Sequence, residues 1–409
     1  MERMTVFFMS IRTSFRHTIL CSYLSYIVQA VVNNFAPLLF LTFQSEFQLS
    51  LEKVSLLVTI NFGIQLLIDL FSAGFVDKIG YRPCLIVAQS LVAVGLVGLA
   101  VFPTLLPNAY CGLLLAIAFY AIGGGLVEVL VSPIVEACPS DCKEGAMSLL
   151  HSFYCWGHLF VVLASTAFFT IFGIQNWRVL ACIWAVLPAL NAVYTSLVPI
   201  LTLAEENGGE SMGLIALCKN GLFWLLMLLM LCSGAAEQAM SQWASAFAEA
   251  GLGVSKTVGD LLGPCLFAVT MGTARVLYAK LANRLPIGPA ITGCGVLCII
   301  SYLLAGLSSN AVLGLIGCGL CGFSVGILWP GSFSTGTKAL PRGGTPLFAM
   351  MALAGDVGCS GGPTLVGLVS SAAKDNLHVG FLAALIFPVL LILCINLTCR
   401  RIKNPAKQA

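Results

Sequence analysis

Long apolar runs separated by short polar segments follow one another along the whole chain. A bilayer is crossed by about 20 predominantly apolar helical residues. Twelve runs of this kind are bounded by charged residues, Gly or Pro, at about 17–43, 54–76, 83–103, 109–137, 145–173, 178–203, 220–247, 257–283, 288–308, 311–338, 344–371 and 376–399. Because several of them exceed about 25 residues, we expect tilted helices or bends at Pro and Gly. The pattern predicts an all-α membrane protein with twelve transmembrane helices.

Composition excludes the other broad classes of protein. Of the 409 residues, 59% are apolar and 9% charged, against about 25% charged in an average soluble domain. A soluble fold and a disordered chain are both excluded by this balance. The 20 Lys and Arg against 17 Asp and Glu leave a net charge of +3, with no basic block to bind nucleic acid. The remaining partners are the lipid bilayer and a small molecule.

The 17 cysteines are scattered singly through the apolar runs. No CxxC pair is flanked by His or Asp, so we expect neither a metal site nor a redox site. Within a bilayer a cysteine behaves as a small apolar residue. We therefore expect no metal and no cofactor.

The basic residues predict the orientation of the chain. With a cytoplasmic N-terminus, the inner loops carry fifteen of them, and the outer loops carry Lys53, Arg178, Lys256 and Lys374. This asymmetry follows the positive-inside rule and places both termini in the cytoplasm. The segment 1–18 lacks a small-residue cleavage site, so we expect it to be a retained cytoplasmic segment and not a signal peptide. Short loops favour a bacterial inner membrane as the location.

The chain divides near its middle, at the polar segment 204–219. Six predicted spans lie on each side, so we expect an N-terminal six-helix bundle over residues 1–203, a cytoplasmic linker and a C-terminal bundle over 220–409. The loop VDKIGYRP (76–83) is echoed by ANRLPIGP (282–289). Two pseudo-symmetric halves of this kind place a substrate site near the midplane between them.

Polar side chains inside the spans are the candidates for function. A charge at the bilayer centre costs at least about 2.5–3.5 kcal/mol, so it needs a partner or a water-filled cavity. The candidates for substrate binding are Gln29, Asn33, Asn34, Asn61, Gln65, His151, Tyr154, His158, Glu237, Gln238, Gln242, Trp243 and Trp329. The candidates for proton coupling are Glu128, Arg275 and Asp356, with Asp69 as a further acid.

Each candidate also has a structural interpretation. Membrane amides commonly link helices at about 0.6 kcal/mol per contact, and buried charges can form ion pairs that pin helices. Since the charges lie in both halves, one shared hydrophilic cavity explains them more economically than separate pairs.

Amides together with Trp, Tyr and His suit a neutral hydroxylated solute, because amides donate and accept hydrogen bonds and aromatic faces stack on sugar rings. Only one buried Arg is present, which fits a polyanion poorly. A carboxylate in a low-dielectric pocket favours its protonated form. Glu128 is therefore the first candidate for a proton-linked acid, and His158 for a relay.

The loop AGFVDKIGYR (73–82) resembles the loop after span 2 in the major facilitator superfamily. Asp77, Lys78, Gly80 and Arg82 fit that family's pattern, whereas Ala73 replaces its first Gly. The resemblance implies the major facilitator fold, and it implies that this loop gates the cytoplasmic side.

Further segments resemble the fucose permease branch of that family, which contains sugar:proton symporters. They are VVNNFAPLLFLTFQSEF (31–47), GGGLVEVLVSPIVE (123–136), SLLHSFYCWGHLF (148–160), GAAEQAMSQW (234–243), Arg275 with Arg284, GILWPGSFSTGTKALP (326–341) and MALAGDVGCSGGPTLVG (351–367). The resemblance assigns the proton-linked acid to Glu128. Pro37 stands where the branch carries an Asp, so its two-carboxylate scheme does not transfer whole.

The leading hypothesis is a monomeric secondary active transporter that moves a sugar-like solute by alternating access, in symport with H⁺. The alternatives are an efflux antiporter for drugs or amphipathic metabolites, and a multispan membrane transferase. A non-transporting sensor would have no need of mid-bilayer charges in both halves. An enzyme is disfavoured, because the longest loop has about 16 residues and the chain has no P-loop, GxSxG, HExxH or EF-hand motif.

Overall fold

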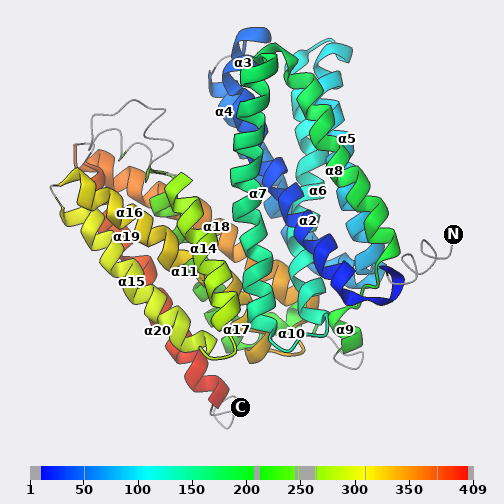
Figure 1. The fold of residues 1–409 in the computed structure, drawn as a ribbon. Helices are drawn as coiled ribbons and strands as arrows, with labels where there is room; N and C mark the ends of the chain where they lie inside the picture. Colours follow the sequence, from blue (N-terminus) through cyan, green and yellow to red (C-terminus); the bar gives the residue numbers. More distant parts are fainter. Residues whose placement is uncertain are drawn as a thin grey trace. The chain divides into compact units, whose positions relative to one another are not determined.

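The computed structural model describes residues 11–49, 51–206, 212–244, 247, 263, 265–308, 310–374 and 376–403. Within these ranges the chain forms helices and turns and no strand (Figure 1). The long helices coincide with the apolar runs, because a backbone in lipid must satisfy its hydrogen bonds internally. The fold class predicted from the sequence is confirmed.

The chain groups into two compact units. The first unit contains Met1–Pro139 and Trp156–Gly209, and the second contains Ser140–Cys155 and Glu210–Ala409. Helix α7 (Lys143–Phe172) therefore contributes its first half to the second unit and its second half to the first. The sequence-based division into residues 1–203, 204–219 and 220–409 stays a prediction.

The other helices of the first unit follow in chain order. They are α2 (Phe15–Asn34), η1 (Ala36–Leu39), α3 (Phe40–Glu46), α4 (Leu51–Ile79), α5 (Tyr81–Leu105), α6 (Ala109–Ala137), η2 (Ile174–Asn176), α8 (Trp177–Leu197) and α9 (Leu203–Glu206).

The second unit continues after the polar segment. Its helices are α10 (Leu214–Cys218), α11 (Gly221–Ser241), α14 (Leu266–Leu281), α15 (Ile287–Leu307), α16 (Ala311–Val325), α17 (Leu328–Ala339), α18 (Gly344–Ala372), α19 (Leu377–Ala384) and α20 (Ile386–Lys403).

Ten helical segments of the described chain are long and apolar enough to cross a membrane. They take up ten of the twelve predicted positions, with α16 and α17 forming one segment and α19 and α20 another. The other two positions are occupied by α14 and α18. Helix α14 is described over only 16 residues. Helix α18 has 29 residues but is interrupted by Gly, Ser, Thr and Asp356, which lower its hydropathy.

Within each unit the helices pack in the same order. In the first unit α5 packs on α6 and α8, α6 also packs on α2 and α4, and α2 packs on α8. In the second unit α15 packs on α16 and α20, α16 also packs on α11 and α14, and α11 packs on α20. The matching pairs are six spans apart in the chain. This repetition supports the duplication that the echoing loops suggested.

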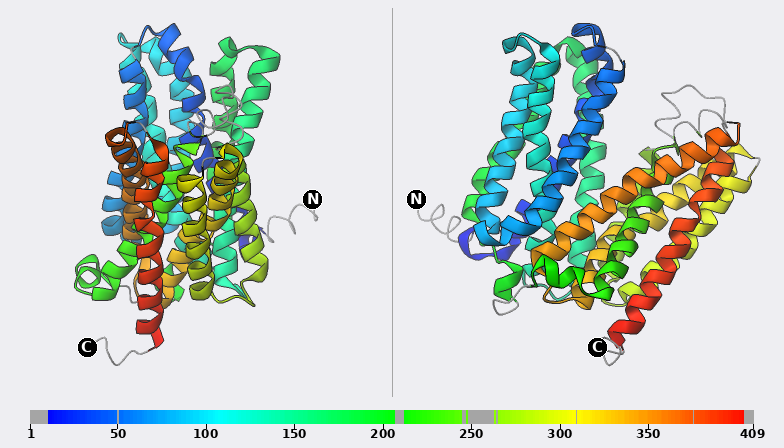
Figure 2. Two further views of the ribbon diagram at one scale, coloured as in Figure 1. Left: turned by 90° about the vertical axis from the view of Figure 1, so that its left-hand side faces the viewer. Right: turned by 180° about the vertical axis from the view of Figure 1, so that it is seen from behind.

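Glycines let two helix pairs approach backbone to backbone. A Cβ added at Gly95 of α5 would lie 2.6 Å from the backbone nitrogen of Tyr120 on α6. In the second unit, a Cβ at Gly358 of α18 would collide with the backbone oxygen of Leu231 on α11. Figure 2 shows α18 (orange) lying beside α11 (green). Small residues permit such contacts in lipid, where van der Waals packing drives helix association.

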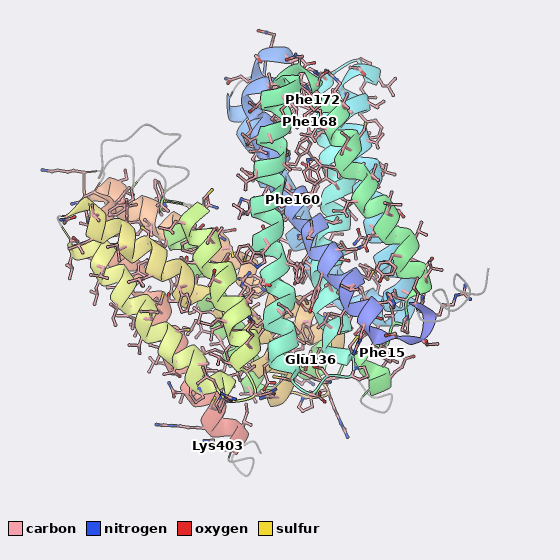
Figure 3. All side chains as sticks on the ribbon, in the orientation of Figure 1. Phe15, Glu136, Phe160, Phe168, Phe172 and Lys403 are labelled. Atoms are coloured by element: carbon pink, nitrogen blue, oxygen red, sulfur yellow. The ribbon has the colours of Figure 1, made fainter. Side chains whose placement is uncertain are left out.

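Large apolar side chains also cover the outside of the helices. Phe160 and Phe172 on α7 are both more than half exposed (Figure 3). Such surfaces would associate in water, whereas in a bilayer they contact the lipid tails.

Candidate functional site

A partly buried carboxylate and two buried amides meet in the first unit, each from a different helix. Gln29 of α2 donates from Nε2 to Oε1 of Gln65 on α4 at 2.8 Å and to Oε2 of Glu128 on α6 at 3.1 Å. Both glutamines are 1% exposed. The Gly-rich stretch of α6 makes room for them, since a Cβ at Gly124 would lie 3.0 Å from Oε1 of Gln29. A neutral amide, that of Gln29, therefore donates to this carboxylate.

Two asparagines continue this contact. Nε2 of Gln65 donates to Oδ1 of Asn33 at 3.0 Å, and Nδ2 of Asn61 donates to the same oxygen at 3.3 Å. Gln29 and Asn33 are one turn apart on α2, and Asn61 and Gln65 are one turn apart on α4, so two helix faces interlock. We call Gln29, Gln65, Asn33 and Asn61 the amide chain.

The amide chain ends at a pocket of mixed character. Asn33 and Asn61 line it together with aromatic residues of three elements, Phe40, Phe62 and Tyr120. The remaining lining residues are apolar: Val32, Ala36, Pro37, Leu57 and Ile117. The pocket has a volume of about 10 Å³, which is room for about one water-sized group. Its amides and aromatic side chains match a hydroxyl group beside an apolar surface.

Two acceptor atoms of the amide chain have no hydrogen-bond partner among the described residues. They are Oε1 of Gln29 and Oδ1 of Asn61, on side chains that are 1% and 5% exposed. An unsatisfied buried acceptor costs about 1–3 kcal/mol. A hydrogen bond to these atoms, from a water, from a solute hydroxyl or after a reversal of the amide hydrogen bonds, would therefore be stabilising.

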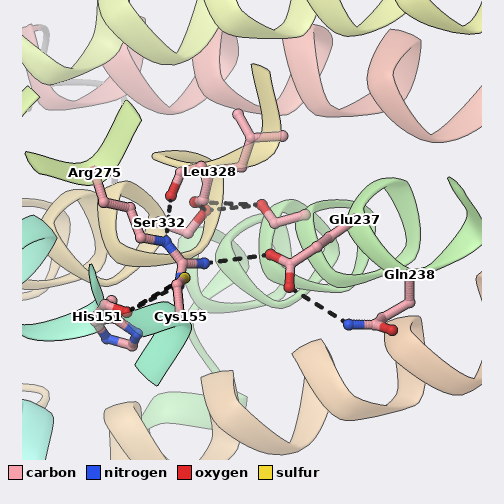
Figure 4. A network of polar contacts seen from close by, with 9 residues as sticks. His151, Cys155, Glu237, Gln238, Arg275, Leu328 and Ser332 are labelled. Carbon is pink, nitrogen blue, oxygen red and sulfur yellow. Dashed lines mark hydrogen bonds and ion pairs between the residues drawn. The ribbon is translucent and has the colours of Figure 1, made fainter. Parts of the chain in front are cut away.

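The second unit holds its buried carboxylate by a charge (Figure 4). Nη2 of Arg275 on α14 lies 3.4 Å from Oε2 of Glu237 on α11, with side-chain exposures of 4% and 13%. The same guanidinium donates from Nε to the carbonyl of Gly326 at 2.7 Å, at the break between α16 and α17. Nη1 donates to the carbonyl of His151 and to Sγ of Cys155, both at 3.0 Å. One side chain thus joins four segments of this unit.

The first half of α7 is attached to the same place. Oγ of Ser148 donates to the carbonyl of Arg275 at 2.8 Å, and Glu144 forms an ion pair with Lys338 at the end of α17. The ring of His151 stacks on Phe333, with centroids 5.9 Å apart. His151 therefore contributes its carbonyl to Arg275, while its ring packs against an aromatic residue.

Two amides continue from Glu237 along the end of α11, Gln238 in the helix and Gln242 directly after it. Nε2 of Gln238 lies 3.4 Å from Oε1 of Glu237, and Nε2 of Gln242 donates to Oε1 of Gln238 at 3.1 Å. Trp243 donates from Nε1 to the carbonyl of Pro363 at 3.1 Å. Trp329 on α17 is 8% exposed, and its ring fills the space beside Gly355.

The remaining predicted site residues are distributed over α2, α4, α7 and α18. Asn34 donates to the carbonyl of Ala30 in its own helix at 2.8 Å. Tyr154 and His158 on α7 and Asp356 on α18 are half-buried. Asp69 is fully buried, one turn after Gln65 on α4.

The predicted gating loop connects α4 with α5. Asp77 and Lys78 are exposed at the end of α4. Gly80 has φ 96° and ψ 151°, a conformation open essentially to glycine. Arg82 donates to the carbonyls of Thr195 at 3.2 Å and Ser196 at 2.9 Å. It therefore satisfies carbonyls at the end of α8, where a cation is favourable.

A third polar cluster, which lies in the first unit, was absent from the sequence-based candidates. Asn191 of α8 donates to Oγ of Ser25 at 3.0 Å, and Gln89 of α5 donates to the same oxygen at 3.0 Å. Cys21 lies within 3.4 Å of Asn191 and 3.2 Å of Thr195. The available signal was a single amide in each of two otherwise apolar runs, 83–103 and 178–203.

Apolar helices in two units, with ionisable groups buried inside each, define a multispan membrane protein of the transporter type. The chain belongs to the Major Facilitator Superfamily, whose family model matches residues 18–363. It is thus a transporter of that superfamily, as the loop 73–82 predicted. No curated protein sequence matches the chain.

Solved structures of this superfamily share the fold. FucP in the outward conformation, a protein also solved as the E. coli fucose:proton symporter, aligns with a TM-score of 0.80 and 17% identity, covering 94% of this chain and 98% of its own. The proton:xylose symporter XylE bound to 6-bromo-6-deoxy-D-glucose aligns with a TM-score of 0.80 and 13% identity, covering 95% and 96%. The human organic anion transporter TETRAN aligns with a TM-score of 0.71 and 14% identity, covering 95% and 100%. At these identities the likeness concerns the fold.

Proposed function

We propose that this protein moves a sugar or a sugar-like neutral hydroxylated solute across the cytoplasmic membrane by alternating access, in symport with H⁺. The observation that carries the proposal is the amide chain of the first unit, which joins a buried carboxylate to a pocket with aromatic walls. Amides bind hydroxyl groups as both donors and acceptors, and aromatic faces cover the apolar face of a ring.

The surroundings of Arg275 support a neutral solute over an anion. Its guanidinium already donates to two backbone carbonyls and a thiol and pairs with Glu237. An anionic solute bound there would have to displace a buried carboxylate, which is costly in a low-dielectric interior. Arg275 and Asp356 remain candidate coupling groups in the second unit.

Glu128 is the proposed proton carrier. It is the one carboxylate that the amide chain contacts in the described structure, and Pro37 stands where the fucose permease branch carries an additional Asp. The two fucose and xylose relatives of known structure are proton symporters by their titles. We therefore expect one proton to be carried by Glu128 in each cycle.

The proposal includes the orientation and the state of assembly. The distribution of basic residues supports cytoplasmic termini, and the short loops support a bacterial inner membrane. We expect a monomer, since one chain supplies both halves of the transporter.

Uptake into proteoliposomes tests the proposal. The purified protein is reconstituted, and the uptake of radiolabelled fucose, xylose and glucose is measured with and without an inward proton gradient. We expect at least one sugar to accumulate only with the gradient. No sugar uptake under any gradient would overturn the proposal. An efflux antiporter would instead move an amphipathic dye in exchange for protons.

Two neighbouring asparagines provide a matched pair of variants. Asn33→Leu removes an acceptor of the amide chain beside the pocket, whereas Asn34→Leu removes a hydrogen bond within α2. Leaving one buried hydrogen-bonding group unsatisfied costs about 1–3 kcal/mol, or roughly 5–150-fold in affinity. We expect the Michaelis constant to rise in Asn33→Leu and to stay near the wild-type value in Asn34→Leu.

A further inference from the structure

The hydrogen bonds of the amide chain share one direction, and that direction matches an ionised Glu128. An ionised carboxylate only accepts hydrogen bonds, so Gln29 presents its NH₂ group to Glu128. The same NH₂ group donates to Gln65, which in turn donates to Asn33, and Asn33 also accepts from Asn61. The charge at one end of the chain therefore determines which atom each amide presents.

Each amide side chain can reverse its polarity by a half-turn about its last bond, because its oxygen and nitrogen occupy nearly equal volumes. A protonated Glu128 becomes a donor and needs an acceptor. The unpartnered Oε1 of Gln29 is that acceptor once Gln29 turns. Gln65 then has to donate to Gln29, Asn33 to Gln65, and Asn33 also to Asn61. The reversed chain keeps all four hydrogen bonds of the observed one.

The hydrogen bonds of Asn61, at the other end of the amide chain, also change when Glu128 is protonated. In the observed direction Asn61 donates to Asn33, and its buried Oδ1 has no partner among the described residues. In the reversed direction its oxygen accepts from Asn33, and its NH₂ group is left to donate. Since Asn61 and Asn33 line the pocket, a bound solute meets a changed pattern of donors and acceptors.

We propose that the amide chain is a polarity relay, in which protonation of Glu128 reverses the hydrogen-bond direction of Gln29, Gln65, Asn33 and Asn61 and so changes the affinity of the pocket for a hydroxylated solute. Gln65 and Gln29 act as positioning residues of the relay. The identity of the solute in this inference rests on the proposed function. The relay itself can be tested by changing the pH with no solute present.

The elements packed against α6 carry other titratable groups. On α2, Tyr26 contacts Ser132 of α6 at 3.1 Å, one turn after Glu128. On α4, the buried Asp69 follows Gln65 by one turn. On α5 the charged residue is Arg82 in the first turn, and on α9 Glu205 bonds Thr202. Of these, Asp69 is the nearest carboxylate along the relay, so the test includes Asp69→Asn.

The test titrates the protein in lipid nanodiscs with no solute present. Infrared difference spectra follow the carboxyl band of Glu128, assigned by its loss in Glu128→Gln. The side-chain NH₂ resonances of ¹⁵N-labelled asparagine follow Asn61, assigned by their loss in Asn61→Leu. In the wild type and in Asp69→Asn, we expect the Asn61 resonances to shift along the same curve as the Glu128 band.

Gln65→Leu interrupts the relay between the two readouts. We expect the Glu128 band to titrate in this variant while the Asn61 resonances stay constant. Gln89→Leu is the matched control, because Gln89 is also a fully buried glutamine of the first unit but bonds Ser25 outside the relay. This control keeps the wild-type response. Glu128→Gln, which preserves shape, abolishes the response and covers the case in which Gln65→Leu does not fold.

The outcomes separate the relay from the proposed function. An Asn61 response that persists in Gln65→Leu, or that is absent in the wild type whether or not the Glu128 band titrates, overturns the relay. A relay that responds as expected in a protein that takes up no sugar leaves the relay standing and overturns the proposed solute. Proton-driven sugar uptake together with Asn61 resonances that do not change with pH supports the proposed function and overturns the relay.

Discussion

One partly buried carboxylate in each unit contacts an identified polar side chain, and the two carboxylates are held in opposite ways. Glu128 is held by an amide, which belongs to a chain of further amides. Glu237 is held by the guanidinium of Arg275, whose other donors bond the carbonyls of Gly326 and His151. A guanidinium only donates, whereas an amide donates or accepts. The first arrangement can thus reverse when its acid changes charge, and the second cannot.

This difference suggests a division of labour. The fixed cation of the second unit anchors α7, α11, α14 and the break between α16 and α17 to one point. In the proposed relay, the neutral chain of the first unit responds to a proton. Four experiments examine this contrast, in order of decreasing effect.

The largest effect is expected for Arg275→Met. It leaves Glu237 buried without its counter-charge and removes the donor to two backbone carbonyls. Removing one partner of a buried pair costs about 3–5 kcal/mol. Unfolding of the purified protein in detergent measures the loss. Combination with Glu237→Gln should recover part of it; a double variant no more stable than Arg275→Met would contradict the anchoring role.

A smaller loss is expected for Gln29→Leu. This change leaves Oε2 of Glu128 and Oε1 of Gln65 without their donor in a buried site. We expect a destabilisation of about 1–3 kcal/mol. Asn34→Leu, which removes a bond inside α2, is the control and should change the unfolding free energy by less than half as much. Equal losses in the two variants would show that the amide chain has no special place in the first unit.

The two carboxylates can be compared directly by the same substitution. Glu128→Gln keeps an acceptor for Gln29, so we expect its stability to change by less than about 1 kcal/mol. Glu237→Gln leaves the charge of Arg275 without its counter-charge, and we expect a loss of about 1.5–3 kcal/mol. Unfolding curves recorded side by side give the difference. The contrast between the units fails when Glu128→Gln is the more destabilising of the two.

The smallest effect is expected at the ion pair between Glu144 and Lys338. The side chain of Lys338 is 51% exposed, so water and salt screen this pair. We expect Lys338→Gln to cost about 0.2–1 kcal/mol, less at high salt than at low salt. A loss of stability as large as that of Arg275→Met would show that this ion pair, and not the one between Arg275 and Glu237, anchors the helices.

Most residues of the candidate site could be identified from the sequence, but the residues with which they form hydrogen bonds could not. The spacing of Asn61 and Gln65 on α4, and of Gln29 and Asn33 on α2, follows from helical periodicity. From the sequence alone, Asn33 and Asn34 were nevertheless equally good candidates for substrate binding. Because neighbours on a helix point about 100° apart, only one of them meets α4.

Arg275 and the third cluster show the same limit. The sequence identified Arg275 as a buried charge, but its partners include backbone carbonyls, which no side-chain pattern reveals. Gln89 and Asn191 were missed because each is a single amide in an apolar run. Their meeting at Ser25 depends on how α2, α5 and α8 pack.

The sequence by itself determined where the helices lie, which loops carry the positive charge and which family the chain resembles. It could do so because the bilayer imposes one length and one polarity on every span. Tertiary packing alone decided which polar side chains meet. The rotation of each helix depends on contacts between surfaces, such as the glycines that bring α6 close to Gln29, and these contacts join residues far apart in the chain.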